Sequence, residues 1–321
     1  MTWVVPVEFS VRLPGLGFAS PRANPAADAP PAPVVVEDAE VSAALAEYEA
    51  GRRRPYYDAA QDGPQAAAYF AAIDPAAKPK PLFEALAKLT KATHKSQPGY
   101  KPSKYVYPVV DVQPDGRLRS IYTDDTYGAA AFIREAVAME RAFEAEVVRL
   151  AAAEGLSEAD AFESALEAAA PFNCEHVVPQ SWFRKAEPMR GDLHHLFTCE
   201  STCNSFRGNR AYRDFLAFEP EATRQACGRT EENRWFEPWH GKGPVARATL
   251  YFLVRYRGEI NAAEIHPEWL ETVKAWHAAD PVTEYERHRN AEIFAKQGNR
   301  NPFIDHPEWV AKVDFAAGIG A

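Results

Sequence analysis

The chain of 321 residues lacks several features that would assign it at once to a common class. No apolar run approaches the roughly 18 residues that a membrane helix needs, so the sequence predicts no membrane association. The sequence contains no internal repeat. The first residues, MTWVVPVEFSVRLPGLGF, have no basic segment, and Pro6, Glu8 and Pro14 interrupt the apolar run. There is therefore no clear signal peptide, and either a cytoplasmic chain or one whose leader is missing fits this start.

An excess of positive charge is also absent, since the net charge is -9 and the pI about 5.6. A wholly acidic protein is a poor general binder of nucleic acid, so a polyanionic substrate would have to meet a locally basic face. One window offers such a face, because residues 78–104 contain seven Lys and one Glu. Phe83, Leu86 and Leu89 recur there at helical spacing, which predicts a helix from Pro81 to the Pro98-Gly99 break. Its lysines either form a solvated face or bind phosphates.

Cysteine is scarce, with four residues at positions 174, 199, 203 and 227. The even number is compatible with two disulfides in an oxidising compartment, and equally with reduced, buried thiols in a cytosol. A structural zinc site could be imagined from Cys174, His194, Cys199 and Cys203. Their spacing lacks the usual CxxC knuckle, so we do not favour zinc.

Proline and alanine are abundant at residues 19–40, which predicts an extended linker. We expect residues 1–75 to form a poorly ordered extension with one short helix at 41–54. Two strands are predicted at 105–123, around the turn Pro114-Asp115-Gly116. Helices are predicted at 128–170, as a pair divided near Gly155, at 245–256, and within 263–296, where Pro281 begins one. The fold class is therefore α+β, with a mostly helical scaffold.

The stretch from Phe172 to Asn209 concentrates polar and reactive side chains, including three His and three of the four Cys. FNCEHVV (172–178) and DLHHLFT (192–198) read as strands, and Ser201 or Thr202 can cap a helix through CNSFRGN. The order strand, loop, strand, helix would fold a hairpin with a helix across it. Such a unit would bring Glu175, His176 and Asn204 within reach of one point.

This set suits metal-assisted hydrolysis of a phosphodiester. Mg²⁺ prefers oxygen ligands and keeps several waters, so one carboxylate and one amide oxygen suffice, from Glu175 and Asn204. His176 suits a general base, because a neutral imidazole accepts a proton near neutral pH. Adjacent residues of a regular strand point to opposite faces, so both Glu175 and His176 can serve only where the strand is twisted, bulged or ending.

Three sequence blocks of this stretch, NCEHVVPQSWF, MRGDLHHLF and CNSFRGN, resemble the endonuclease I family of bacterial ββα-metal (His-Me finger) nucleases. The resemblance continues in FEPWHGKGPVARATLYFLVRY, DPVTEYERHRN and QGNRNPFIDHPEW. It covers roughly residues 80–310 and is strongest from 172 to 309. It implies a nuclease domain at 76–313 with a ββα-metal core.

Roles for individual residues follow from the positions that match. Glu175 and Asn204 match the metal ligands and His176 the general base. Asp192 and His195 match groups that support this site from behind, and Arg207 and Asn209 match the RxN after the ligand asparagine. Some members carry a carboxylate where this chain has Arg190, which could instead bind phosphate. The resemblance implies Mg²⁺ as the one bound ion, with Mn²⁺ or Ca²⁺ able to occupy the same site.

Further substrate contacts are expected from cations outside these matches. Arg184 and Arg190 lie in the loop between the two predicted strands, and Lys242 and Arg247 lie at a predicted helix start, where anions bind well. Arg207 or a loop arginine would steady the charge of the transition state. Trp182, Phe183, Trp235 and Trp239 could stack on bases, although core packing is the simpler interpretation.

The resemblance implies a nuclease with little sequence specificity that leaves 5′-phosphate ends. Its substrate would be DNA, often RNA too, with no obligate protein partner and a secreted or periplasmic location. The alternative is a catalytically inactive nucleic-acid-binding or scaffold protein that keeps the fold. The intact set of Glu175, His176 and Asn204 argues against this alternative.

Overall fold

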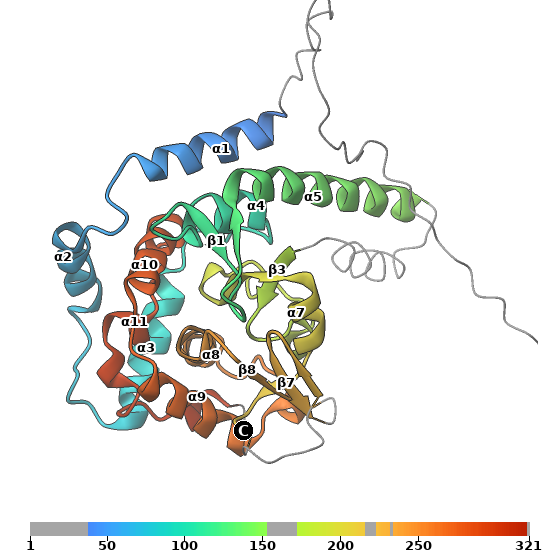
Figure 1. Ribbon diagram of the computed structural model, residues 1–321. Helices are drawn as coiled ribbons and strands as arrows, with labels where there is room; N and C mark the ends of the chain where they lie inside the picture. The colour runs from blue at the N-terminus through green and yellow to red at the C-terminus, as the bar shows by residue number, and fades with distance from the viewer. Residues whose placement is uncertain (1–37, 153–171, 216–222, 232–233, 320–321) are drawn as a thin grey trace, which may run out of the picture. The chain divides into compact units, whose positions relative to one another are not determined.

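The computed structural model describes residues 38–152, 172–215, 223–231 and 234–319 of the chain (Figure 1). These residues belong to one compact unit that begins at Asp38. They are mostly helical and contain three small sheets, which confirms the predicted α+β class. No helix among them is long and apolar enough to cross a membrane.

Two N-terminal helices, α1 (Ala39–Arg52) and α2 (Ala59–Phe70), belong to this unit. The predicted helix at 41–54 is thus present, and it lies beside α5 (Ala129–Ala152) in Figure 1. Asp62 of α2 makes a two-pronged ion pair with the buried Arg300, at 2.8 and 2.9 Å. Residues 38–75 are therefore folded against the rest of the unit, and the expectation about residues 1–37 lies outside the described residues.

Helix α8 (Lys242–Arg255) forms the centre of the unit, and all of its residues except Lys242 and Pro244 are buried. It confirms the helix predicted at 245–256 and begins three residues earlier. The helices that surround it are α3 (Pro79–Thr93), α9 (Pro267–Ala279), α10 (Glu284–Gln297) and α11 (Pro302–Asp305) (Figure 1). A helix buried on every side must be apolar all round, as Val245 to Val254 largely are. The short helices are α4 (Pro102–Tyr105), η1 (Val106–Val110), η2 (Gln180–Phe183), η3 (Leu193–His195), η4 (Ala262–Glu264), η5 (Pro307–Trp309) and η6 (Phe315–Gly318).

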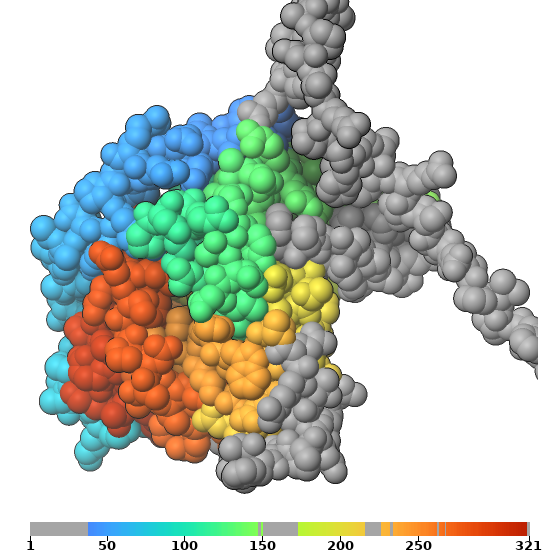
Figure 2. All heavy atoms as spheres, in the orientation of Figure 1, coloured from blue at the N-terminus to red at the C-terminus, as the bar shows by residue number. Residues whose placement is uncertain are grey.

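The three sheets are small. Strand β1 (Arg117–Arg119) pairs with β2 (Thr126–Gly128), and β3 (Phe172–His176) pairs antiparallel with β4 (Leu196–Glu200). A third sheet, which the sequence did not predict, has the order β5 (Ala211–Tyr212), β8 (Trp235–Pro238), β7 (Gly228–Glu231), β6 (Thr223–Gln225). In Figure 2 the green region around β1, β2 and α5 adjoins the yellow region that contains β3, β4 and helix α7 (Ser201–Arg207).

One strand prediction is wrong, and another is wrong in its first residues only. Residues Val106–Val110 form a turn of π-helix, in which every residue is buried. Asp111, which follows it, pairs with Arg289 and accepts from the backbone of Thr198, so tertiary contacts override the β-branched composition of this run. Residues Leu193–His195 form a 3-10 turn because the Asp192 carboxylate accepts from the His194 amide at 3.0 Å. The strand begins only at Leu196.

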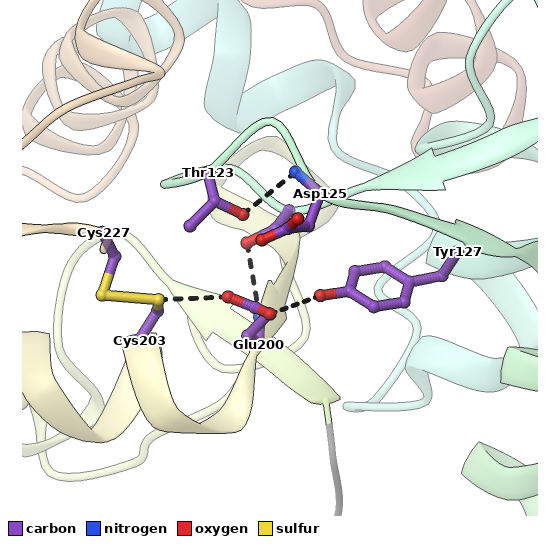
Figure 3. The surroundings of a disulfide bond; sticks show 7 residues. Thr123, Asp125, Tyr127, Glu200, Cys203 and Cys227 are labelled. Atoms are coloured by element: carbon purple, nitrogen blue, oxygen red, sulfur yellow. Dashed lines mark hydrogen bonds between the residues drawn. A yellow bond between two sulfur atoms is a disulfide. The ribbon is translucent and has the colours of Figure 1, made fainter. Parts of the chain in front are cut away.

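One disulfide, Cys203–Cys227, joins the start of α7 to the turn between β6 and β7. Figure 3 shows the Glu200 carboxylate beside it, where it accepts from the Tyr127 hydroxyl at 2.6 Å. Cys174 and Cys199 are free and buried. Cys199 is opposite Asn173 across the hairpin, whereas Cys174 is opposite Thr198, so the two thiols point to opposite faces and cannot pair. The chain therefore has one of the two disulfides that four cysteines allow.

Candidate active site

The candidate site is built on the hairpin of β3 and β4 and on α7, which follows β4 directly. The hairpin register places Glu175 opposite Phe197 and His176 opposite Leu196. Helix α7 packs against both strands. Glu200 is its N-cap residue rather than Ser201 or Thr202, and no side chain makes a capping hydrogen bond there. This unit fixes the three residues that the sequence singles out.

Glu175 lies in a buried network on one face of β3, with 1% of its surface exposed. Its Oε1 accepts from the Tyr122 hydroxyl at 2.7 Å and lies 3.1 Å from a guanidinium nitrogen of Arg207. Tyr122 is in turn hydrogen-bonded to Tyr212 at 2.7 Å. Burial raises the pKa of Glu175, although Arg207 and Tyr122 both act to lower it. The carboxylate is thus held rigidly, in an environment where added positive charge would stabilise its ionised form.

His176 is the last residue of β3, so it lies where the strand ends. Its Nε2 is 3.0 Å from the carbonyl oxygen of Arg190, and its ring packs 4.8 Å from Tyr100 and 5.4 Å from His195. Burial first, and then the neighbouring His195, lower the pKa of His176 well below its usual value. The ring is therefore neutral near pH 7. A carbonyl only accepts, so Nε2 carries the proton and Nδ1 is the nitrogen that can take one.

Asn204 is tied to β3 by its amide nitrogen. Its Nδ2 donates to the Oδ1 of Asn173 at 2.8 Å and to the carbonyl of Cys174 at 3.4 Å. Because the nitrogen is used in this way, Oδ1 is the end of the amide that can serve as a ligand. Asn173 shares its strand face with Glu175, so the structure brings Asn204 to the side of β3 on which the carboxylate lies.

Two oxygen donors of this kind fit a hydrated divalent cation. Mg²⁺ is bound through one or two protein oxygens and keeps several waters. Zinc ligation by the cysteines does not fit, because Cys203 is in the disulfide and Cys174 and Cys199 face opposite sides. Among the described residues there is also no cluster of three or more His, Cys, Asp or Glu side chains that could hold a metal.

Asp192 and His195 lie behind the hairpin, and Asp192 is the centre of a buried network. Its carboxylate accepts from Tyr251, Tyr256 and the Gln297 amide at 2.7 to 3.0 Å. Burial alone would raise the pKa of Asp192, but the surrounding His94, His194 and His195 and the Gln297 amide lower it below its usual value. His195 donates from Nε2 to the Met189 carbonyl at 2.7 Å, and its ring contacts His176. Both residues are therefore buried and do not face solvent.

The buried imidazoles predict an acid-sensitive fold. Burial lowers the pKa of His194 and of His195 to about 4, against about 6.5 in an unfolded chain. Between these values the unfolded state binds more protons, so the free energy of unfolding falls as the pH falls from about 6.5 to 4, by about 3 kcal/mol for each ring. Urea denaturation of the wild type and of His195→Gln, at pH 7 and pH 4.5, measures this. The variant should lose less stability between the two pH values than the wild type, and equal losses would contradict the assignment.

The residues that the sequence predicts to contact substrate differ in their surroundings. Arg184 and Asn209 are exposed, and Arg190 is partly buried, with its guanidinium 4.9 Å from the Tyr100 ring and its Nε on Gln180. Lys242 pairs with Asp214 and Glu237, at 2.8 and 2.6 Å. Substrate binding by Arg184, Arg190 and Asn209 stays a prediction. Lys242 would have to leave two carboxylates to reach a phosphate.

Two arginines do not have the surroundings that the sequence predicts. Arg247 is fully buried and forms a two-pronged pair with Glu286, at 2.5 and 2.8 Å, so the structure contradicts its assignment to substrate binding. Arg207 is 2% exposed and donates to the carbonyls of His176 and Val177 at 3.0 and 2.6 Å. It therefore fixes the backbone at the end of β3 and the Glu175 carboxylate.

Sequence reasoning missed four residues that complete the site: Tyr100, Tyr122, Asn173 and Tyr212. Only Asn173 left a usable signal, because it precedes Glu175 by two residues and so shares its strand face. The three tyrosines come from distant segments, and no local spacing marks them.

The fold and the site together define an α+β protein with a polar, largely buried site on a β-hairpin and the helix that follows it. The model of one family, Endonuclease I, matches residues 83–308, well over half of the chain. The chain belongs to the Endonuclease I family.

Several curated relatives are similar in sequence to part of this chain. An extracellular ribonuclease of Bacillus subtilis (strain 168) is 35% identical over 158 residues, covering 44% of this chain and 54% of the relative. An extracellular ribonuclease of Bacillus amyloliquefaciens is 34% identical, covering 44% and 53%. A periplasmic deoxyribonuclease of Aeromonas hydrophila is 30% identical, covering 43% and 64%. The chain spans about half the length of the first two relatives.

Proposed function

We propose that the protein is a divalent-metal-dependent endonuclease that hydrolyses DNA and RNA with little sequence preference and leaves 5′-phosphate ends. The observation that carries this proposal is the arrangement of His176. Its imidazole is neutral, its Nε2 is fixed by the Arg190 carbonyl, and it follows Glu175 directly in a strand to which Asn204 is tied. Family membership and the names of the relatives support the coarser part of the proposal, cleavage of RNA and DNA.

Glu175 and Asn204 would hold the cation, for which Mg²⁺ is the expected ion and Mn²⁺ or Ca²⁺ are possible replacements. When bound, a divalent cation neutralises the charge of the scissile phosphate and orients it. The Tyr122 hydroxyl and Arg207 fix the Glu175 carboxylate for this role. The Asn173 side chain fixes the Asn204 amide so that its oxygen is presented.

His176 would accept a proton at Nδ1 from the water that attacks phosphorus. The Arg190 carbonyl holds the tautomer that leaves this nitrogen without a proton, and burial keeps the ring neutral. Arg207 is too deeply buried to contact the transferring phosphoryl group, so we assign it to positioning the end of β3. Stabilisation of the transition-state charge then falls to the cation and to the loop arginines, Arg184 and Arg190.

Recognition would rest on the phosphate backbone, because backbone contacts position a substrate without reading its bases. Six of the seven lysines in residues 78–104 are exposed and offer a basic surface, while Lys101 pairs with Glu144. Binding through such contacts weakens steeply with salt. The disulfide and the extracellular or periplasmic relatives support a location outside the cytoplasm.

The test is incubation of the purified protein with supercoiled plasmid and with RNA, in Mg²⁺ or in EDTA. We expect nicking and RNA cleavage in Mg²⁺ and neither in EDTA. Binding of both substrates without cleavage in Mg²⁺ would overturn the proposal in favour of an inactive nucleic-acid-binding protein. Equal cleavage in EDTA would overturn the metal dependence.

A further inference from the structure

A cavity of about 200 Å³ lies next to the candidate site, between α5, β3 and the segment around Tyr100. Its lining residues include three aromatic residues, Tyr100, Phe132 and Phe143, and Met139. An apolar cavity of about 150 Å³ already admits a benzene ring, so this one is large enough for a planar aromatic group.

The residues that line this cavity also touch the site. Asn173 contributes to the cavity wall, and its Oδ1 accepts from Asn204 at 2.8 Å. Arg190 contributes to the wall, and its carbonyl is the partner of His176 at 3.0 Å. Tyr100 packs against the His176 ring at 4.8 Å. The cavity therefore lies one side chain away from the candidate base and from the candidate amide ligand.

The charges around the cavity favour an uncharged occupant. Glu140 and Glu144 line it, and they are balanced by Lys101, which pairs with Glu144, and by Arg190. The Glu140 carboxylate accepts from the backbone and hydroxyl of Ser103 at 3.0 and 2.6 Å. Two carboxylates disfavour a phosphate inside. A neutral, flat group with phosphates outside, near Arg190, suits both the charges and the aromatic walls.

We propose that this cavity takes an unpaired nucleobase of the strand being cut, next to the scissile phosphate. This inference rests on the proposed nuclease function and adds a substrate class to it. A base in a duplex would have to leave its stack to enter, so the cavity favours single-stranded RNA or DNA over duplex. Stacking on aromatic walls tolerates all four bases, which is consistent with weak sequence preference.

Binding tests the proposal without catalysis. The probe is a single-stranded pentanucleotide with a central 2-aminopurine, whose fluorescence is quenched by stacking, added in EDTA so that it stays uncut. We expect quenching by the wild type. Met139→Trp, which fills the cavity, and Phe143→Ala, which removes a wall, should raise the Kd about 5- to 100-fold, the range found for loss of one stacking partner. Ala138→Trp on the exposed side of α5 is the matched control and should bind as the wild type does.

Cleavage in Mg²⁺ supplies the second readout. The two cavity variants should lose activity on the single strand while nicking supercoiled plasmid at the wild-type rate, which also shows that they are folded. An unquenched probe with active wild-type protein, or an equal loss on both substrates, would overturn the cavity assignment and leave the nuclease proposal standing. Quenching by a wild type that cuts neither substrate would overturn the nuclease proposal instead.

Discussion

Replacement of His176 by alanine is expected to lower kcat about 10²- to 10⁴-fold, the usual contribution of a general base. The imidazole is neutral, and its Nε2 is fixed on the Arg190 carbonyl, so Nδ1 is the nitrogen that would accept the proton. KM should change little, because the ring is 5% exposed and contributes little contact surface. The measurement is single-turnover cleavage of supercoiled plasmid in saturating Mg²⁺.

The matched control for this variant is His240→Ala. His240 is a surface histidine, 45% exposed, whose Nδ1 lies 3.5 Å from Asp124. The His240→Ala variant should cleave at the wild-type rate. Equal rates for His176→Ala and the wild type would remove His176 from the mechanism and with it the assignment of the base.

Replacement of Arg207 by methionine is expected to lower the free energy of unfolding by about 3–5 kcal/mol, the cost of breaking a buried ion pair from one side. The change leaves the buried Glu175 carboxylate without the guanidinium beside it, and it removes the donations that Arg207 makes to the carbonyls of His176 and Val177. Urea denaturation in EDTA measures the loss.

Two further variants separate charge from position at Arg207. Arg184→Met removes an exposed arginine and should change stability by less than about 0.5 kcal/mol. Arg207→Lys keeps the charge but loses the planar guanidinium that contacts two carbonyls and Glu175. The free energy of unfolding of this variant should therefore lie between those of the wild type and Arg207→Met. A stability loss below 1 kcal/mol for Arg207→Met would show that the guanidinium does not hold the end of β3 in place.

The sequence predicted the order strand, loop, strand, helix of the site because local signals agree there. β3 begins with an aromatic residue and is followed by Val177, Val178 and Pro179, and polar residues begin α7. It failed at Leu193–His195, where two histidines precede a strand-like run. There the Asp192 side chain satisfies the backbone and starts a turn, a choice that depends on the buried network around Asp192.

Long-range partners were beyond sequence reasoning. Glu175 and Tyr122 are 53 residues apart, and Tyr122 and Tyr212 are 90 apart, yet they share one network. The same limit explains Arg247, which was predicted from its place near a helix start. Its charge is neutralised by Glu286, 39 residues away, and no local pattern shows this pairing.

The prediction that residues 1–75 lie outside the folded unit was wrong for residues 38–75, for a related reason. Residues 38–75 are weakly apolar and follow a Pro- and Ala-rich segment, so composition placed them outside the domain. Tyr48 is buried and donates to the Gly116 carbonyl at 2.8 Å, Asp62 pairs with Arg300, and Phe70 is buried in the core, so specific polar contacts and apolar packing together bring these helices into the unit.

The central claim, that Glu175 and Asn204 hold one cation beside His176, is tested most directly by counting bound Mn²⁺. Electron paramagnetic resonance reports the free ion during titration of the protein. We predict one bound ion for the wild type and for His176→Ala, and none for the isosteric Glu175→Gln or for Asn204→Ala. One ion retained by Glu175→Gln and Asn204→Ala, or none bound by the wild type, would contradict the account.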